Sequence, residues 1–181
     1  MLDGEENIIK SAVKGEASAF GLLYDYYQPK IYRFVLVKVS RREEAEDLTH
    51  QVFLRAWQNI ATYRDIGFPF SSWLYHIARN RVIDHYRTSR PSVSIDEVDP
   101  EIFASPEESV ASTERSLTLD RVRAAIRALK PDHQDVIVLR FVEDLPLKNV
   151  ALIIGKSEGA VKLIQHRAIR ELKRLLELPE D

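Results

Sequence analysis

Basic side chains follow one face of a predicted helix near the end of the sequence. The stretch SEGAVKLIQHRAIRELKRL begins at Ser157, and its charged residues recur at steps of three and four, which places them on one helix face. This outward stripe consists of Lys162, His166, Arg170 and Lys173, flanked by Leu163, Arg167 and Arg174. Cations hold phosphates while other side chains of such a helix reach base edges, so the stripe indicates binding in the major groove of DNA.

A second candidate surface combines an aromatic ring, hydrogen-bonding groups and a cation. The stretch SSWLYHIARNRVIDHYRTSR places four such residues on one helix face, at spacings of three, four and seven: Trp73, His76, Asn80 and Arg87. Unpaired bases bind to aromatic and hydrogen-bonding side chains, and further charge for phosphates comes from Arg79, Arg81 and Arg90. The same residues also suit a core tryptophan on an ordinary basic surface helix. The pattern alone leaves both interpretations open.

A third predicted helix, REEAEDLTHQVFLRAWQNI, has a polar face of mixed charge. Its apolar stripe, which we expect to be buried, consists of Ala45, Leu48, Val52, Ala56 and Ile60. The polar face follows the same steps and consists of Glu44, Asp47, Gln51, Arg55 and Gln58. Periodicity alone favours a solvated surface with ordinary charge pairs within the helix.

Prolines and serines mark where the helices of the first part begin. Pro29 separates the apolar stretches FGLLYDYY and IYRFVLVKVS, and we expect it in the first turn of a helix. Ser71 or Ser72 is available to cap the helix that carries Asn80. These stretches have helical rather than strand periodicity.

A helix-turn-helix is predicted in the last part of the chain. An amphipathic helix covers residues 119–129, and Pro131 begins another that is expected to run to Pro146. LKNVALII then ends at Gly155, which can adopt the left-handed conformation, and Ser157 can cap the final helix. Small and apolar residues near the turn allow the two helices to cross closely. The buried stripe of the final helix consists of Val161, Ile164, Ala168, Leu172 and Leu175.

Acidic residues are concentrated between these two parts. The chain has 181 residues and a net charge of -2, but residues 91–117 contain 7 acidic residues against 1 basic residue. Three prolines and no sustained period indicate a linker there. We therefore expect an all-α fold of two small helical domains, residues 1–90 and 118–181, joined by a flexible acidic linker at 91–117.

The composition also excludes several classes of function. Cysteine is absent, which removes disulfides, thiolate catalysis and Cys-ligated zinc. The five histidines have no metal-ligand spacing, and the 6 glycines form no phosphate-binding loop. We therefore expect no enzyme activity, no cofactor and no metal. Without a membrane-length apolar run or a signal-like start, the protein is expected to be cytoplasmic with no membrane insertion.

Two stretches, in this order, resemble conserved regions of the bacterial sigma-70 family. AEDLTHQVFLRAW and PFSSWLYHIARNRVIDHYR are similar to its second region, and ALKPDHQDVIVLRFVEDLPLKNVALIIGKSEGAVKLIQHRA is similar to its fourth. The chain has no room for the extra regions of longer members, so it resembles the small extracytoplasmic function (ECF) sigma factors. The resemblance implies an RNA polymerase sigma factor, which binds core polymerase, recognises promoter elements and promotes DNA melting for transcription initiation.

The resemblance assigns roles to residues of the first domain. In the family, the helix matching residues 43–59 docks on the clamp helices of the polymerase beta-prime subunit, which implies contacts by Asp47, Leu48, Gln51, Arg55 and Trp57. The family usually reads DLTQEVF where this chain reads DLTHQVF, so we expect altered polar contacts at His50 and Gln51. The loop 62–71 and the next helix would recognise and open the minus-ten element through Trp73, His76, Arg79, Asn80, Ile83, Asp84 and Arg87.

The fourth-region match implies contacts with the minus-thirty-five element and the polymerase beta flap. The implied DNA-binding residues are Ser157, Glu158, Gly159, Lys162, Leu163, His166, Arg167 and Arg170. This chain departs from the family at three positions. Where it has Leu163, the family commonly has a polar residue; where it has Ile164, an arginine; and where it has Gln165, an apolar residue. Ile164 is therefore expected to take over the core position, and Leu163 to touch a thymine methyl or remain an exposed leucine.

The resemblance also implies a path for the linker and a protein partner, and one competing class of function stays open. By resemblance, the acidic linker would pass through the polymerase cleft toward the RNA exit path, and an anti-sigma factor would restrain the protein. The competing class is a helix-turn-helix regulator that binds duplex DNA as a dimer. It would need a dimerisation helix and gives no role to the motifs of the first domain.

Overall fold

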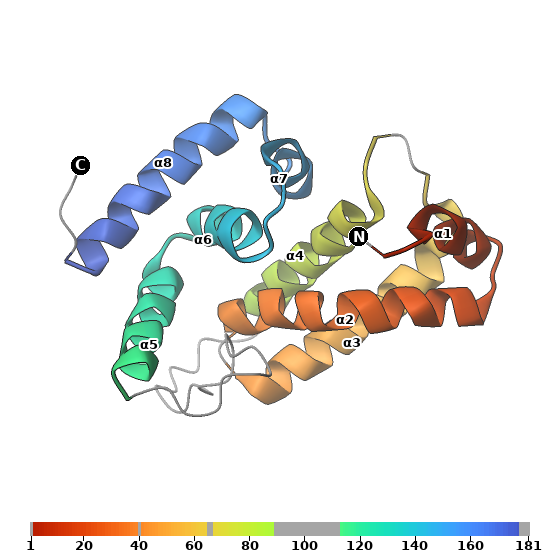
Figure 1. Cartoon of the computed structure of the whole chain (residues 1–181), viewed down its shortest axis with the longest axis horizontal. Coiled ribbons are helices and arrows are strands. Elements are labelled where there is room, and N and C mark those ends of the chain that lie inside the picture. Colours follow the sequence, from red (N-terminus) through yellow and green to blue (C-terminus); the bar gives the residue numbers. More distant parts are fainter. Residues whose placement is uncertain (1, 40, 65–66, 89–112, 178–181) are drawn as a thin grey trace.

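The computed structural model describes residues 2–39, 41–64, 67–88 and 113–177, and every regular element in these ranges is a helix. The first domain consists of α1 (Glu5–Val13), α2 (Ala17–Val39), α3 (Arg42–Asn59), the 3-10 turn η1 (Ile60–Thr62) and α4 (Phe70–Thr88). The second domain consists of α5 (Thr113–Ala128), α6 (Pro131–Ile137), the π-helical turn η3 (Val138–Val142), α7 (Leu147–Ile154) and α8 (Glu158–Leu175) (Figure 1). The all-α prediction is confirmed.

One continuous helix, α2, forms the centre of the first domain. Pro29 lies inside it, so the prediction that this proline begins a helix is wrong. Proline removes one backbone hydrogen bond from a helix interior. Here Tyr27 and Ile31, on either side of the proline, are buried against neighbouring helices, and this packing holds the two halves in line.

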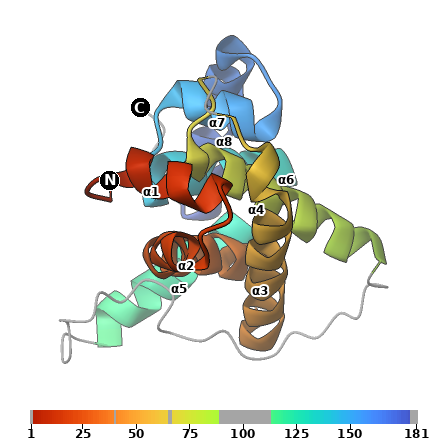
Figure 2. The ribbon, with the colours of Figure 1, turned by 90° about the vertical axis from the view of Figure 1, so that its right-hand side faces the viewer.

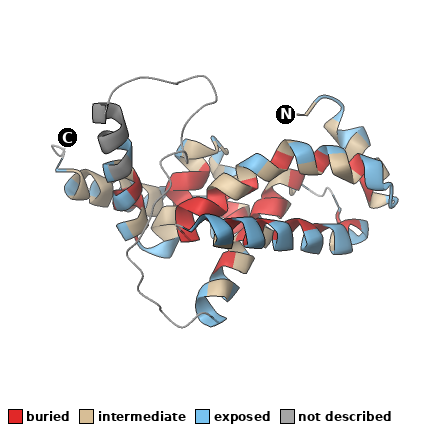
Figure 3. Ribbon diagram, turned by 90° about the horizontal axis from the view of Figure 1, so that it is seen from below, coloured by how far each residue is buried: buried red, intermediate tan, exposed pale blue. Residues whose placement is uncertain are grey.

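The apolar stripe of α3 packs against α2 as its periodicity predicts, and all five stripe residues are buried. In Figure 3 the buried residues lie along the lines where helices face one another, and the outer faces are exposed. The short helix α1 packs on α2, and its Ile8, Ile9 and Ala12 join the same core. The sequence interpretation missed α1, although the apolar spacing of these residues indicates it.

The boundary of α4 differs from the prediction. The helix begins at Phe70, so Ser71 and Ser72 lie within its first turns rather than capping it. Ser72 is fully buried, and Phe70 is buried between Tyr27 and Tyr63 at ring-centroid distances of 5.6 and 5.4 Å. Burial of this aromatic ring therefore sets the helix start more strongly than a capping hydroxyl does.

The second domain follows the predicted helix signals with two differences. Its first helix, α5, already begins at Thr113, whereas residues 91–112 of the predicted linker lie outside the described residues. The helix that begins at Pro131 changes to a π-helical turn at Val138 and ends at Val142, before the expected Pro146. Gly155 adopts φ 67°, and the Ser157 hydroxyl accepts a hydrogen bond of 3.2 Å from the Ala160 N–H, so both ends of the predicted turn are confirmed.

The two domains pack directly against each other. Backbone atoms of α4 and α7 approach within 8 Å, and α2 likewise contacts α5. Figure 2 shows α6 and α7 lying over the first domain beside α4. The buried apolar residues form one cluster that includes members of both domains. Within the described ranges, no helix combines the length and apolar character that crossing a membrane requires.

Candidate nucleic-acid and protein interfaces

The basic face of α8 is exposed from Lys162 to Arg170, and Lys173 at its end is half-buried. Its inward residues Val161 and Ala168 are fully buried, and Ile164, Leu172 and Leu175 pack partly against the core. The opposite side leaves exposed all the residues expected to contact the minus-thirty-five element: Ser157, Glu158, Gly159, Lys162, Leu163, His166, Arg167 and Arg170. The helix begins with a satisfied cap and presents cations to solvent, an arrangement suited to a DNA groove.

The structure shows the surroundings of the three residues at positions 163–165, which differ from those common in the sigma-70 family. Ile164 packs against the core, as expected from the apolar spacing. Gln165 is partly buried, and its Oε1 accepts a hydrogen bond of 3.3 Å from Nε of Arg140 in the π-helical turn. Arg140 also donates to the Leu145 carbonyl, so Gln165 helps to fix the chain between η3 and α7. Leu163 is 51% exposed and remains on the outer face of α8.

The outer face of α4 presents an amide and hydrogen-bonding groups to solvent. His76, Asn80, Ile83, Asp84 and Arg87 are all exposed. The Asn80 amide nitrogen lies 3.5 Å from Nδ1 of His76, and Arg87 lies 3.7 Å from the Asp84 carboxylate. Although the residue is exposed overall, partial desolvation of the ring and the Arg79 charge lower the pKa of His76, which keeps this ring neutral near pH 7. Neutral imidazole and amide groups can donate to and accept from the edges of unpaired bases.

Trp73 is part of an aromatic cluster at the start of α4. Its ring centroid lies 5.3 Å from Tyr63 and 5.5 Å from Phe70, and the residue is half-buried. The Tyr63 hydroxyl donates to the Phe68 carbonyl at 3.0 Å, which ties the preceding loop to this cluster. The tryptophan therefore packs in the core and keeps part of its ring exposed, and the binding of an unpaired base to that exposed part stays a prediction.

Arg79 does not face solvent with the other residues expected to bind the minus-ten element. Its guanidinium contacts two carboxylates of α6, with Nε 2.8 Å from Asp135 and Nη2 3.0 Å from Asp132. In this conformation α6 therefore holds the Arg79 guanidinium, and the expected contact of Arg79 with the minus-ten element stays a prediction. The guanidinium is held because the domains pack together and α6 covers this side of α4.

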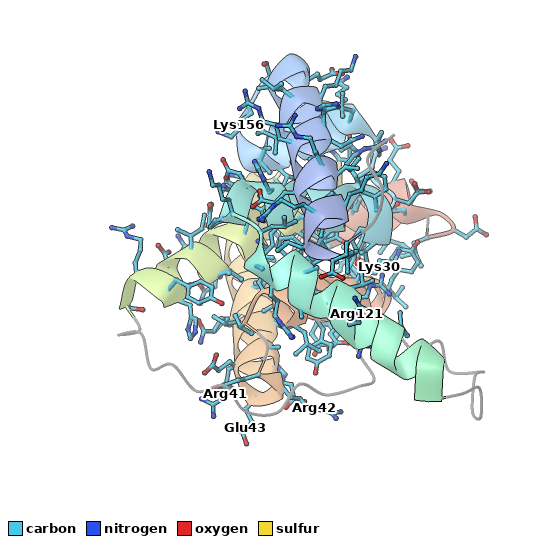
Figure 4. All side chains as sticks on the ribbon, turned by 90° about the vertical axis from the view of Figure 1, so that its left-hand side faces the viewer. Lys30, Arg41, Arg42, Glu43, Arg121 and Lys156 are labelled. Atoms are coloured by element: carbon cyan, nitrogen blue, oxygen red, sulfur yellow. The ribbon has the colours of Figure 1, made fainter. Side chains whose placement is uncertain are left out.

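Most of the polar face of α3 is exposed, but its first residue, Glu44, is half-buried and lies 3.5 Å from the His85 ring of α4. Asp47, Gln51, Arg55 and Trp57 are exposed, whereas Leu48 is only 5% exposed. Leu48 belongs to the buried stripe that holds α3 on α2, so it does not lie on the exposed face, and its implied polymerase contact stays a prediction. Figure 4 shows Arg41, Arg42 and Glu43 at the outer end of α3, away from the second domain.

Two exposed leucines of the first domain, one of them on this polar face, were not predicted from the sequence. Leu54 is 58% exposed and lies three residues after Gln51 on the polar face, and Leu22 of α2 is 52% exposed. Trp57 is 36% exposed, and its ring packs at a tilt against Phe20 of α2, with 4.9 Å between the ring centroids. The sequence signal that could have indicated this surface is Leu54, an apolar residue at a position of the polar stripe. An apolar patch bordered by charged groups is typical of a protein-binding surface.

A second apolar surface lies in the second domain, where a groove of about 410 Å³ runs between α5, η3 and α8. The described residues that line it are all apolar: Leu119, Val122, Ile126, Ile137, Phe141, Val142, Ile169 and Leu172. Phe141 is 57% exposed at its edge. Within the described residues, no cluster of three or more potential metal ligands occurs.

Comparisons with known families match both domains. A model of sigma-70 region 2 matches residues 23–91, which contain α3 and α4. A model of sigma-70 region 4 matches residues 125–174, which contain the helix-turn-helix. The two matches fall in the order of the resemblance described above.

Individual relatives agree with the family models. The ECF RNA polymerase sigma factor BldN of Streptomyces coelicolor is 41% identical over 178 residues, which cover 96% of this chain and 66% of BldN, slightly under two thirds. The ECF RNA polymerase sigma factor SigW of Bacillus subtilis is 33% identical over 180 residues, covering 93% of this chain and 94% of SigW.

A solved structure has a similar fold. In the complex of the sigma factor RpoE with the anti-sigma factor NepR from Bartonella quintana, the similar chain has a TM-score of 0.69 and 22% identity. The comparison covers 89% of this chain and 98% of the other. At this identity the similarity shows the fold alone.

Proposed function

The chain belongs to the sigma-70 family, in its ECF group, and on this premise we propose that it directs core RNA polymerase to promoters by two separate DNA contacts. The observation that supports the proposal is the presence of two exposed helix faces in different domains, one with hydrogen-bonding side chains on α4 and one with basic side chains on α8. A sigma factor is an initiation factor rather than a catalyst, and it would work with polymerase in the cytoplasm.

The α4 face is proposed to hold the melted strand of the minus-ten element. Melting needs a surface that replaces the stacking and pairing lost by the bases. Asn80 supplies an amide, His76 a neutral imidazole, and Trp73 a partly exposed ring. Ile83, Asp84 and Arg87 continue this surface along the helix. Binding energy for the exposed strand then drives melting without a nucleotide cofactor.

The α8 face is proposed to read the minus-thirty-five element as duplex. Its first turns, which carry Lys162 and Arg167, would lie nearest the base edges, and Arg170 would hold phosphate. Leu163, at 51% exposure, can contact a thymine methyl group. A single small module makes few contacts, so polymerase would supply the rest of the affinity.

Two surfaces are proposed to bind polymerase. The exposed α3 face with Asp47, Gln51 and Arg55 would dock on the beta-prime clamp helices, and Leu54 adds apolar area at its centre. The apolar groove beside Phe141 would take an apolar segment of the beta flap. An anti-sigma factor, like the NepR partner named for the similar RpoE, is proposed to compete for these surfaces.

Run-off transcription tests the proposed function. Core polymerase, with and without this protein, would be given a library of genomic fragments. We expect transcripts from defined start sites only when both are present. Duplex binding by the protein alone as a dimer, with no polymerase-dependent initiation, would instead support the helix-turn-helix regulator.

Substitutions in α8 should separate phosphate contact from base reading. Arg170→Ala is expected to weaken promoter binding evenly across sequences and to reduce the salt slope by about 1, because one fewer counterion is released. Lys162→Ala is expected to relax preference at one or two base positions. Binding of holoenzyme to a promoter and its point variants at several salt concentrations measures both effects. If both substitutions altered sequence preference alike, the assigned geometry of α8 would be wrong.

A further inference from the structure

One arginine of the second domain connects the middle of α8 to the turn that precedes α7. Nε of Arg140 donates a hydrogen bond of 3.3 Å to Oε1 of Gln165, and Nη1 of the same guanidinium donates to the Leu145 carbonyl. The Leu145 N–H in turn donates to the Leu139 carbonyl at 2.9 Å, which ties this turn back to the π-helical segment. Arg140 therefore holds α8 to a part of the domain that is itself fixed.

The contact between Arg140 and Gln165 is directional because of the groups that make it. A guanidinium carries only donors, so the amide oxygen of Gln165, and not its NH2 group, has to face Arg140. These donors lie in one plane at fixed angles, and a hydrogen bond weakens steeply when it bends. Because the Leu145 carbonyl holds a second donor, the guanidinium cannot turn freely to follow Gln165. An apolar side chain at position 165, which is common in the sigma-70 family, would pack here without such a direction.

Gln165 lies beside residues that are proposed to read DNA. It follows Lys162 by three positions and directly precedes His166, and both of these are exposed whereas Gln165 and Arg140 are half-buried. Side-chain tips lie about 6 Å from the axis of a helix, so a rotation of about 20° moves them by about 2 Å. Lengths of good hydrogen bonds vary by only about 0.5 Å. A small rotation of α8 would therefore change which base edges its exposed side chains reach.

The apolar contacts of α8 constrain this rotation less strictly. Its fully buried residues, Val161 and Ala168, are small, and the larger Ile164 is only partly buried. A second polar contact, 3.5 Å between Nδ1 of His133 on α6 and the Glu171 carboxylate, lies toward the other end of α8. The hydrogen bond at Gln165 is thus the polar contact placed nearest to the proposed reading residues among those described for α8.

We propose that Arg140 and Gln165 are positioning residues for promoter reading: their hydrogen bond sets the rotation of α8, and thereby the base preference of its exposed side chains, without touching DNA. This role rests on the proposed sigma function. The hydrogen bond itself does not, and it can be tested in the free chain.

The first experiment observes the hydrogen bond in the free, full-length chain. Proton–nitrogen NMR spectra contain a signal from the Hε proton of Arg140, which is assigned by its loss in Arg140→Met. We expect this proton to exchange with water at least about tenfold more slowly in the wild-type chain than in Gln165→Met, because a bonded proton is protected. Methionine has nearly the same length as glutamine but lacks a strong acceptor. Equal exchange in these two proteins would overturn the proposal.

The second experiment measures base preference with core polymerase present. Holoenzyme binding is compared on a promoter and on its point variants in the minus-thirty-five element. Gln165→Met and Arg140→Met should each reduce discrimination about fivefold or more at the same one or two positions, because one well-placed base contact is lost. The double variant should match either single variant, since both already break the same hydrogen bond.

A conservative variant and a control separate positioning from general stability. Gln165→Glu keeps an acceptor for Arg140, so slow exchange and wild-type preference should return, even if its charge lowers affinity for every sequence. Glu171→Gln removes the other polar contact of α8 and should leave the preference unchanged. Thermal unfolding should show a shift in Tm of less than about 4 °C for each variant. If Gln165→Met exceeded this shift, Gln165→Leu would replace it, with the same change in preference required.

Three outcomes of the binding experiment would overturn the proposal. Unchanged preference in both single variants would exclude a positioning role. A change in Gln165→Met without one in Arg140→Met would mean that Gln165 contacts DNA directly. The same change in Glu171→Gln would mean that any loosening of α8 has this effect. Failure of the sigma function looks different: the wild-type holoenzyme would then show no base preference, and the promoter role would fall with it, while proton exchange in the free chain would still decide whether the hydrogen bond exists.

Discussion

Holoenzyme assembly is expected to weaken by roughly 30-fold when Asp47 and Arg55 are both replaced by alanine, which corresponds to about 2 kcal/mol. Both side chains are exposed on the α3 face. Within the described residues, neither side chain makes a contact that the helix needs for folding. Truncation at a protein interface removes charge-assisted contacts that the free protein does not use. Competition binding to core polymerase measures the effect.

The matched control for this variant also removes an acid and a base. Glu6 and Lys10 form an exposed pair at 2.6 Å within α1, and their joint replacement by alanine should leave polymerase affinity unchanged. Circular dichroism should show equal helicity for all variants. If the variant without Asp47 and Arg55 bound polymerase as tightly as the wild-type chain does, the α3 face would be excluded as the clamp-helix interface. Leu54→Ala offers an independent probe, because this exposed leucine lies at the centre of the same face.

Open-complex formation is expected to fall roughly tenfold when Asn80 is replaced by alanine, because an amide that pairs with an unstacked base contributes about 1–3 kcal/mol. The amide is exposed and its described contact is the 3.5 Å approach to His76 on the same helix, so the fold should be unaffected. Reactivity of unpaired thymines on promoter DNA measures melting. Closed-complex binding on the same promoter should stay close to the wild-type value.

A pre-melted promoter bubble identifies the step at which Asn80 acts. The substitution should still lower affinity for the bubble, because the unpaired base loses its amide partner even when melting is no longer required. Asn7→Ala, which removes an exposed amide from α1, serves as the control and should behave as wild type on both templates. Equal defects in closed-complex binding and melting would assign Asn80 a structural role instead.

Local signals in the sequence predicted much of the fold and of both DNA faces. The buried stripes of α3 and α8 follow from steps of three and four, because residues at these steps share one side of a helix whatever lies around it. Gly155 and Ser157 mark the turn before α8 through their own backbone and side-chain preferences. Asn80, Lys162 and Arg170 are exposed because they lie on the sides of their helices that face away from the core. The DNA-binding and polymerase-binding roles of these residues stay predictions.

Packing between distant residues decided the features that local signals predicted wrongly. Pro29 remains inside α2 because buried side chains on both sides of it outweigh one missing hydrogen bond. Phe70 begins α4 in place of a serine cap because its ring is buried in an aromatic cluster. Local preferences are worth about 1 kcal/mol each, whereas burial of a large apolar side chain contributes more.

The relation between the two domains was decided by tertiary structure alone. The sequence determined two helical domains and an acidic stretch between them, since periodicity and charge are read from neighbouring residues. Arg79 and Asp135 are 56 positions apart, and Arg33 and Glu143 are 110 positions apart. No spacing rule relates side chains at such separations, because their contact depends on how every intervening helix packs. An arginine that the sequence places on a DNA face is therefore held by the other domain, and only the folded chain determines this.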